Sequence, residues 1–176
     1  MTRALIIGDG PGGLSAALFL AKNGVEPIVI GSNDTPMHKA LLLNYLGVPR
    51  VTGTDFMAEA RKQVLVIGAE IHDLEVQSLS RDGERFVARC ADGKTFDGKY
   101  VIIASGDKKL AEAIGVDLGA APNLDMCTNV ERAYLLGWLV RKKKIQAITS
   151  AGDGAAAALH ILSAEKGADF HDFDLV

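Results

Sequence analysis

The chain has 176 residues, a length typical of one domain, and 48% of them are hydrophobic, which is enough to fold around a core. The net charge of −3 leaves no basic excess, so the composition argues against a nucleic-acid-binding protein. No apolar run reaches the ~20 residues of a membrane span, and we expect a cytoplasmic protein with no membrane contact.

The two cysteines, Cys90 and Cys127, are far apart in the sequence. They form neither a C-x-x-C pair nor a zinc-binding spacing, so no metal site is predicted. We expect each to be a small buried or half-buried side chain, since cysteine packs mostly as a small hydrophobe.

The N-terminal part predicts a strand, a glycine-rich loop, a helix and a second strand. Residues 3–7 are apolar and bounded by glycine, residues 14–22 have helical periodicity and end at Asn23-Gly24, and residues 25–30 are again apolar. Such a unit predicts a parallel sheet with a right-handed crossover.

The middle of the chain predicts a loop, one helix and an antiparallel meander. Residues 31–49 predict mainly loop, with a helical piece over 39–43. Thr54 is expected to cap a helix over 55–62. Residues 64–71 are expected to form a third strand. Three short strands follow, because Asp82-Gly83 and Asp92-Gly93 are hairpin signals; they are expected at 76–79, 85–90 and 95–100.

The last part predicts two more strands and a long helix. The strands are expected at 100–104 and 134–136, and a helix over 145–166 ends at Gly167. The small residues of this helix, among them Gly152 and Gly154, would let it approach another backbone or a ligand closely. Between and after these elements we expect a linker with one helical turn at 107–123 and an unstructured tail at 169–176.

The first loop carries the spacing Gly8-x-Gly10-x-x-Gly13 between a strand and a helix. Gly8 permits the tight turn, Gly10 lets backbone amides approach a pyrophosphate, and Gly13 lets the helix pack closely on the strand. The helix N-terminus adds unpaired N–H donors. This context favours dinucleotide binding; a purely structural glycine turn is the alternative.

The second strand lacks the acidic residue that usually binds the adenosine ribose at its end. Gly31 stands at this place, and Ser32, Asn33 and Asp34 follow it. Ribose recognition would therefore depend on these three residues or on the main chain.

Four segments resemble the thioredoxin reductase-like flavoproteins, the low-molecular-weight branch of the pyridine nucleotide-disulfide oxidoreductases. They are the glycine loop, Asn44-Tyr45-Leu46-Gly47 with 53–57, the strand over 100–106, and 126–130 through 146–152. The resemblance covers most of 3–106 and 124–166. It implies a Rossmann-like FAD-binding α/β fold of three layers, with a parallel sheet and a small antiparallel β-meander. Residues 1–176 would be a single FAD-binding domain, with 1–106 and 124–168 packed together.

The resemblance also implies site residues. Gly10, Pro11 and Gly12 would contact the FAD pyrophosphate. Asn44 would lie near the flavin, with His38 in the loop that crosses its face. The N-terminus of the last helix would face the ring, although Gln146 also fits a plain surface residue. No catalytic residue is assigned. The complete candidate set is Gly8, Gly10, Pro11, Gly12, Gly13, Gly31, Ser32, Asn33, His38, Asn44, Ala104, Ser105, Gly106, Gly137, Trp138, Gln146, Ala147 and Ile148.

The chain departs from the family in three places. Residues 107–123 stand where the family inserts its NADPH domain, and they are too few for even one βαβ unit of ~30 residues. The family's C-x-x-C is absent with that domain. Trp138 replaces the aspartate that binds the flavin's ribityl chain, and an indole accepts no hydrogen bond. It would stack on the flavin, turn away from it or pack at an interface.

A basic run, Arg141 to Lys144, precedes the last helix. It fits either a solvated loop or a site for an anion or an acidic partner beside the flavin.

These observations predict a minimal FAD oxidoreductase that exchanges electrons with a separate partner protein or a small-molecule acceptor. Two alternatives stay open: a non-catalytic FAD-binding structural or sensory module, and a protein that binds NAD or another adenine nucleotide. We also expect a homodimer that helps to cover the flavin.

Overall fold

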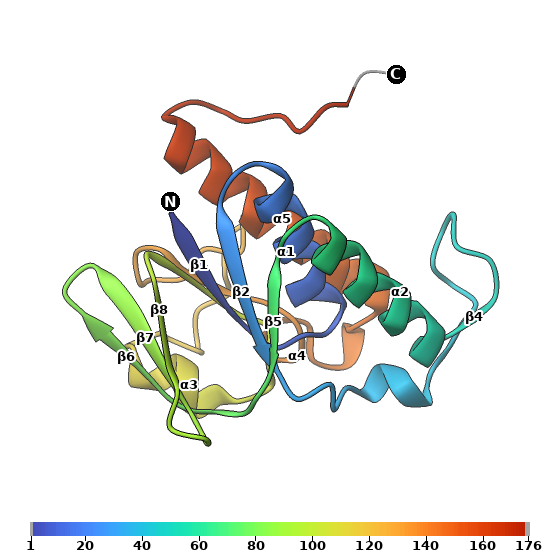
Figure 1. Ribbon diagram of the computed structural model, residues 1–176, viewed down its shortest axis with the longest axis horizontal. Helices are drawn as coiled ribbons and strands as arrows, with labels where there is room; N and C mark the ends of the chain where they lie inside the picture. The colour runs from blue at the N-terminus through green and yellow to red at the C-terminus, as the bar shows by residue number, and fades with distance from the viewer. Residues whose placement is uncertain (1, 175–176) are drawn as a thin grey trace.

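The computed structural model describes residues 2–174, which form three layers (Figure 1). The middle layer is a parallel sheet in the order β10–β9–β1–β2–β5. Its strands are β1 (Arg3–Ile7), β2 (Glu26–Gly31), β5 (Glu70–Asp73), β9 (Tyr100–Ile103) and β10 (Ala133–Leu135).

Helices cover one face of this sheet and an antiparallel meander covers the other. The helices are α1 (Pro11–Lys22), α2 (Gly53–Val66) and α5 (Ala147–Lys166). The meander consists of β6 (Val76–Asp82), β7 (Arg85–Cys90) and β8 (Thr95–Gly98), joined by α3 (Lys108–Ala113). The predicted Rossmann-like α/β fold with a small antiparallel meander is confirmed.

The apolar run of β1 is continuous because both of its faces are buried. Ala4 and Ile6 point into the core under the helices, whereas Leu5 and Ile7 point into the core under the meander. Side chains alternate along a strand, so a sheet covered on both sides needs apolar residues at every position. The same alternation holds for β9, which is buried throughout.

Helices α1 and α5 lie against each other although they are far apart in the sequence (Figure 1). A Cβ atom at Gly154 of α5 would overlap the carbonyl oxygen of Gly12 at the start of α1. The predicted close backbone approach of the last helix is therefore confirmed at Gly154. Gly152, by contrast, has open space where its Cβ would be.

The prediction for residues 39–71 was wrong in its boundaries. Thr52, not Thr54, caps α2: its Oγ1 accepts a hydrogen bond from the Asp55 amide at 3.1 Å. The helix continues through the β-branched residues near its end because Val64 is buried against the core, and packing outweighs local propensity. Gly68, with φ +97°, follows the helix. The strand predicted over 64–71 is therefore confined to β5, which begins at Glu70.

Two other segments also differ from the prediction. The expected helical piece over 39–43 is a 3-10 turn, η1 (Pro36–Lys39), followed by β3 (Leu41–Leu42), which pairs with β4 (Val51–Thr52). The basic run is not a loop: it spans the end of α4 (Trp138–Arg141) and the turn η2 (Lys142–Lys144). α5 accordingly begins at Ala147 rather than 145.

The segment over 107–123 contains α3, whose Leu110 and Ala111 are buried in the core under the meander. In the tail, residues 169–174 form no helix or strand, and 175–176 lie outside the described residues. Both cysteines are small packed side chains, as predicted: Cys90 is buried and Cys127 half-buried. Burial raises the pKa of both thiols, which leaves them protonated at neutral pH.

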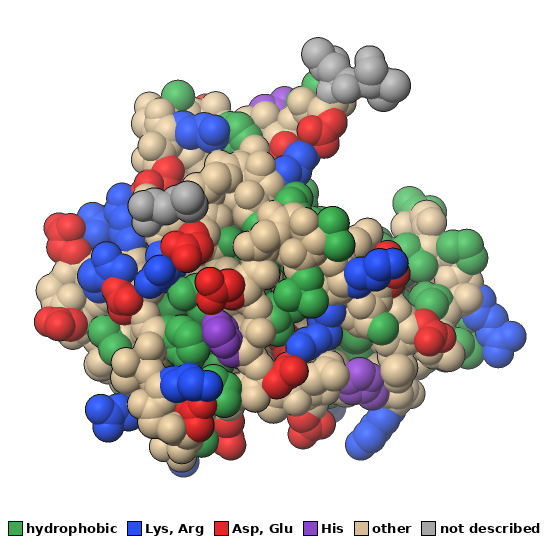
Figure 2. Space-filling model, viewed as in Figure 1, with side chains coloured by type: hydrophobic (Ala, Val, Ile, Leu, Met, Phe, Trp, Pro, Cys, Tyr) green, Lys and Arg blue, Asp and Glu red, His purple; other side chains and the backbone are tan. Residues whose placement is uncertain are grey.

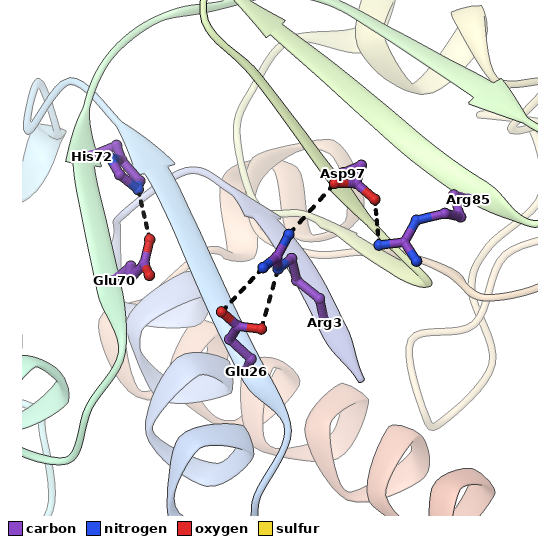
Figure 3. Close-up of polar contacts among 6 residues, drawn as sticks. All are labelled: Arg3, Glu26, Glu70, His72, Arg85 and Asp97. Atoms are coloured by element: carbon purple, nitrogen blue, oxygen red, sulfur yellow. Dashed lines mark hydrogen bonds and ion pairs between the residues drawn. The ribbon is translucent and has the colours of Figure 1, made fainter. Parts of the chain in front are cut away.

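An arginine on β1 connects three strands (Figure 3). Arg3 donates to Glu26 on β2 at 3.2 and 3.3 Å and to Asp97 on β8 at 3.5 Å. Asp97 also pairs with Arg85 on β7. Because these groups are partly exposed, we take them to align the meander on the sheet rather than to add much stability.

Acidic and basic side chains are interspersed over the face drawn in Figure 2, in keeping with the small net charge. Among residues 2–174, no helix has the length and apolar character needed to cross a membrane.

Glu165, near the end of α5, joins the last helix to the first strand and its neighbour. Its carboxylate accepts hydrogen bonds from Thr2 at 2.5 Å, Lys99 at 2.6 Å and Tyr100 at 2.8 Å. Burial of the carboxylate raises its pKa, but these three donors and the Lys99 charge outweigh burial and lower the pKa to about 2.

Replacing Glu165 by Gln should therefore cost stability only above the folded-state pKa. A group with a lowered folded pKa stabilises the fold above its unfolded pKa and loses that contribution as the pH falls. We expect E165Q to be about 2–3 kcal/mol less stable at pH 7, and the difference to vanish between pH 5 and pH 2. Urea denaturation across this range measures it, with the exposed Glu59→Gln as control, expected within about 0.5 kcal/mol.

The contact between α1 and α5 predicts opposite effects for two glycines on one helix. Gly154→Ala should lower the free energy of unfolding by about 1–3 kcal/mol, because its methyl group would force the helices apart. Gly152→Ala should raise it by about 0.5–1 kcal/mol, since alanine favours the helix and nothing obstructs it. Equal effects of the two substitutions in chemical denaturation would contradict the described packing.

Candidate functional site

A cleft of about 690 Å³ opens at the carboxyl ends of β1, β2 and β9. The residues that follow these strands line it, among them Gly8, Gly31 and Ala104. β1 lies between β9 and β2, so the chain leaves the sheet in opposite directions on either side of it. Ligands of open α/β sheets bind at this point, because the diverging loops leave a crevice there.

The three glycines of the first loop have different roles. Gly8 has φ +112°, and a Cβ there would lie 2.8 Å from the carbonyl carbon of Ala104. A Cβ at Gly13 would overlap the carbonyl oxygen of Gly8. These two positions hold the loop, the helix and β9 together. Gly10 has an ordinary extended conformation with no atom within 4 Å of a built Cβ, so it faces the open cleft.

The N-terminus of α1 points its unpaired amides at the cleft. Gly10 caps the helix without a side-chain hydrogen bond, and Pro11 at the first position has no N–H. The first intrahelical bond runs from the Leu14 amide to the Gly10 carbonyl at 3.0 Å. The amide of Gly12, which lines the cleft, is thus left for an anionic ligand at the positive end of the helix.

The opposite wall comes from the end of β9 and the start of α4. Ser105 contributes an Oγ that is buried and has no hydrogen-bond partner among the described residues. Gly137, with φ +71°, lies close to Ala104. Trp138 follows at the edge of the cleft with 55% of its surface exposed. This wall therefore offers one unsatisfied hydroxyl and one large, half-exposed ring.

The start of α5 forms the far end of the cleft. Gln146 caps the helix, and its side-chain oxygen accepts a hydrogen bond from Asn44 at 3.0 Å. Thr149 supports the turn: its Oγ1 accepts from the Gln146 amide at 3.0 Å. Ala147 and Ser150 line the cleft beside them. The positive end of a second helix dipole thus opens on the same space as that of α1.

Comparison with known proteins identifies the family. The profile of the pyridine nucleotide-disulphide oxidoreductases matches residues 2–153. This chain belongs to that family.

Relatives within this family include thioredoxin reductases. The chain is 38% identical over 111 residues to a thioredoxin reductase of Helicobacter pylori, covering 60% of this chain and 36% of that protein. It is 28% identical over 174 residues to a ferredoxin–NADP reductase of Ignicoccus hospitalis, covering 96% of this chain and 54% of that protein. The chain therefore spans about a third to a half of the length of these relatives.

A solved structure supports the same fold. A thioredoxin reductase of Gloeobacter violaceus superposes with a TM-score of 0.85 at 14% identity, covering 99% of both chains. At this identity the likeness concerns the fold alone.

Most residues that the sequence indicated meet in this one cleft of the oxidoreductase fold. Those that line it are Gly8, Gly10, Pro11, Gly12, Gly31, Ser32, Asn44, Ala104, Ser105, Gly106, Gly137, Trp138, Gln146 and Ala147. Four predicted residues do not line it: Gly13, Asn33, His38 and Ile148.

These four differ for local reasons. Gly13 lies beneath the loop, where it permits close packing. Ile148 is on the outer side of the first turn of α5. His38 fastens the loop instead: its Nδ1 lies 3.1 Å from Thr54 Oγ1, and its Nε2 lies 2.9 Å from the carbonyl oxygen of Asn33. Asn33 has φ +55°, so His38 holds a turn in a left-handed conformation.

Sequence reasoning missed Asp9, inside the glycine loop. Asp9 is buried, and its Oδ2 accepts hydrogen bonds from the Asn33 amide at 3.1 Å and from Arg61 at 2.5 Å. Arg61 also pairs with Asp73 at 2.5 Å. The sequence does contain a signal for this role. Gly31 stands at the end of β2, where an acidic residue is usual, and an acidic residue, Asp9, stands in the glycine loop instead.

The basic run is divided by the structure. Arg141 forms an ion pair with the buried Asp153 of α5, with 2.8 Å between its Nε and Oδ2. The three lysines of η2 are exposed. Arg141 therefore balances a buried charge and fixes α4 against α5, although it remains partly exposed, whereas the lysines have no ion-pair partner among the described residues.

Proposed function

We propose that this chain binds FAD in the cleft and passes electrons between the flavin and a separate partner protein or small-molecule acceptor. The observation that carries the proposal is that the N-termini of α1 and α5 open on one cleft. A dinucleotide with an anionic diphosphate in its middle and a flavin at one end suits two positive helix ends.

The residues present fit this cofactor. The amide of Gly12 and the open space at Gly10 suit the diphosphate, and the orphaned Ser105 Oγ would gain a partner. Gln146 and Ala147 would face the flavin ring, where the helix dipole favours negative charge on a reduced flavin. When bound, FAD would supply the capacity to accept and release electrons, and the protein would position it.

A separate electron donor is proposed because of the segment between β9 and β10. Residues 107–123 hold only α3 and a loop, and the sequence contains no C-x-x-C. A relative named ferredoxin–NADP reductase supports a donor or acceptor protein as the partner. We place this activity in the cytoplasm.

We further propose that a second copy of the chain covers part of the site. Residues 43–50 project beside β4, and hydrophobic side chains gather on this arm (Figure 2). Leu43 and Leu46 are 71% and 90% exposed, and Trp138 at the cleft edge is half exposed. Exposed apolar surface of this kind favours association.

A second candidate function rests on Trp138. An indole at the cleft edge cannot replace a carboxylate as a hydrogen-bond acceptor, but it can stack on a bound ring. In that case the chain would hold FAD as a structural or sensory group without turnover.

The absorption spectrum of the purified protein is the first test. We expect a yellow protein whose flavin is bleached by dithionite, but which NADPH alone does not reduce in anaerobic stopped flow. Mass spectrometry of the heat-released ligand should identify FAD. Release of NAD or ADP instead would favour a nucleotide-binding protein, and stoichiometric reduction by NADPH would overturn the need for a separate donor. Rapid turnover with an acceptor would exclude the structural or sensory role.

Substitutions at Gly10 separate folding from cofactor binding. Gly10→Asp should leave the fold intact or stabilise it, because aspartate caps helices well and nothing obstructs it. Its charge should weaken FAD binding at least tenfold by repelling the diphosphate, an effect of about 1.4 kcal/mol. Gly10→Ala is the matched uncharged control. Equal FAD affinity of the two variants in fluorescence titration would argue against a diphosphate at this helix end.

A further inference from the structure

At the end of β2, a glycine stands where an acidic residue is usual. Dinucleotide-binding units of this type commonly place an acidic side chain there, where it binds the hydroxyls of the adenosine ribose. In this chain the position is Gly31, and a Cβ built on it would overlap Oδ1 of Asp9 and lie 2.5 Å from its Cγ. The Asp9 carboxylate therefore occupies the space into which a side chain at position 31 would extend.

The surroundings hold this carboxylate in one orientation. Oδ2 is occupied by the Asn33 amide and by Arg61, which provides the counter-charge that a buried carboxylate requires. Arg61 also donates a hydrogen bond through its Nη2 to Oδ1 of Asp73. Within residues 2–174, Oδ1 has no hydrogen-bond donor, although Asp9 is only 5% exposed.

Asp9, whose Oδ1 is unpartnered, lies in the wall of the cleft. Asp9, Gly31 and Ser32 all line it, next to the start of α1 where the diphosphate is placed. A carboxylate oxygen is solely an acceptor, so its partner must be a donor such as a hydroxyl group.

We propose that Asp9 binds the adenosine ribose of the dinucleotide, taking the place of the missing acidic residue at the end of β2. Oδ1 accepts a hydrogen bond from a ribose hydroxyl, while Arg61 and the Asn33 amide hold Oδ2. Gly31 is required because any side chain there would displace the carboxylate. This inference rests on the proposed dinucleotide binding and names the residue that selects its ribose.

The test begins with the unaltered protein. ADP and 2′,3′-dideoxy-ADP are compared as ligands by calorimetry, with FAD measured alongside. We expect ADP to bind about 10- to 100-fold more tightly than the dideoxy analogue, the range for a hydrogen bond to a charged group. Equal binding of the two would overturn the role of Asp9 while leaving FAD binding intact. If neither FAD nor ADP binds, both this inference and the proposed function fail.

Variants then assign the effect to Asp9. Asp9→Asn should weaken FAD and ADP about 10- to 100-fold and remove the preference for ADP over the dideoxy analogue. Asp73→Asn is the matched control: it alters the exposed partner of Arg61 without touching the cleft, and should change affinity less than about twofold. An Asp9→Asn protein that keeps the preference would contradict the inference.

A reciprocal exchange distinguishes ribose binding from a merely structural role. In Asp9→Gly with Gly31→Glu, the acidic group moves to the strand end, and the overlap is removed. We expect this double variant to recover the preference for ADP that Asp9→Gly alone loses. Failure to recover it, in a protein whose circular dichroism and melting curve show a folded state, would sink the proposal.

Discussion

Direct backbone contact at the glycine loop is the constraint on which the rest of the structure depends. Gly8 lies on Ala104 directly after β9, Gly13 lies on Gly8, and Gly12 lies on Gly154 of α5. A side chain at Gly8, Gly13 or Gly154 would collide with neighbouring backbone atoms. These contacts draw β1, β9, α1 and α5 together so closely that the N-termini of two helices share one cleft.

That arrangement explains the electrostatic character of the site. Among the described residues, no lysine or arginine lines the cleft, so the groups that it offers to an anion are the unpaired amides at the helix ends. Two buried carboxylates at or near the cleft are paired, Asp9 with Arg61 and Asp153 with Arg141. These ion pairs hold the glycine loop and α4 in position around the cleft, which Ser105 lines with a buried Oγ that has no partner among the described residues.

Two differences from the family's pattern lie in the cleft itself, one at each end of the proposed FAD site. At the end proposed for the adenosine, the Asp9 carboxylate occupies the space that a side chain at position 31 would fill. At the end proposed for the flavin, the ring of Trp138 stands where the resemblance implies a carboxylate. Under the proposed binding, the first change retains a carboxylate near the ribose, whereas the second removes one near the ribityl chain.

The parallel sheet, the meander and the glycine loop followed from local pattern, whereas most other cleft residues were implied by the resemblance to a family. Apolar runs, glycine spacing and hairpin turns are written in neighbouring residues, so the sequence alone determined them. Tertiary structure decided the rest: α2 extends through Val64 because that side chain is buried, and α3 forms because Leu110 and Ala111 find a core. Asp9, Arg61 and Gly31 meet only in space, because contacts between distant residues depend on how whole elements pack.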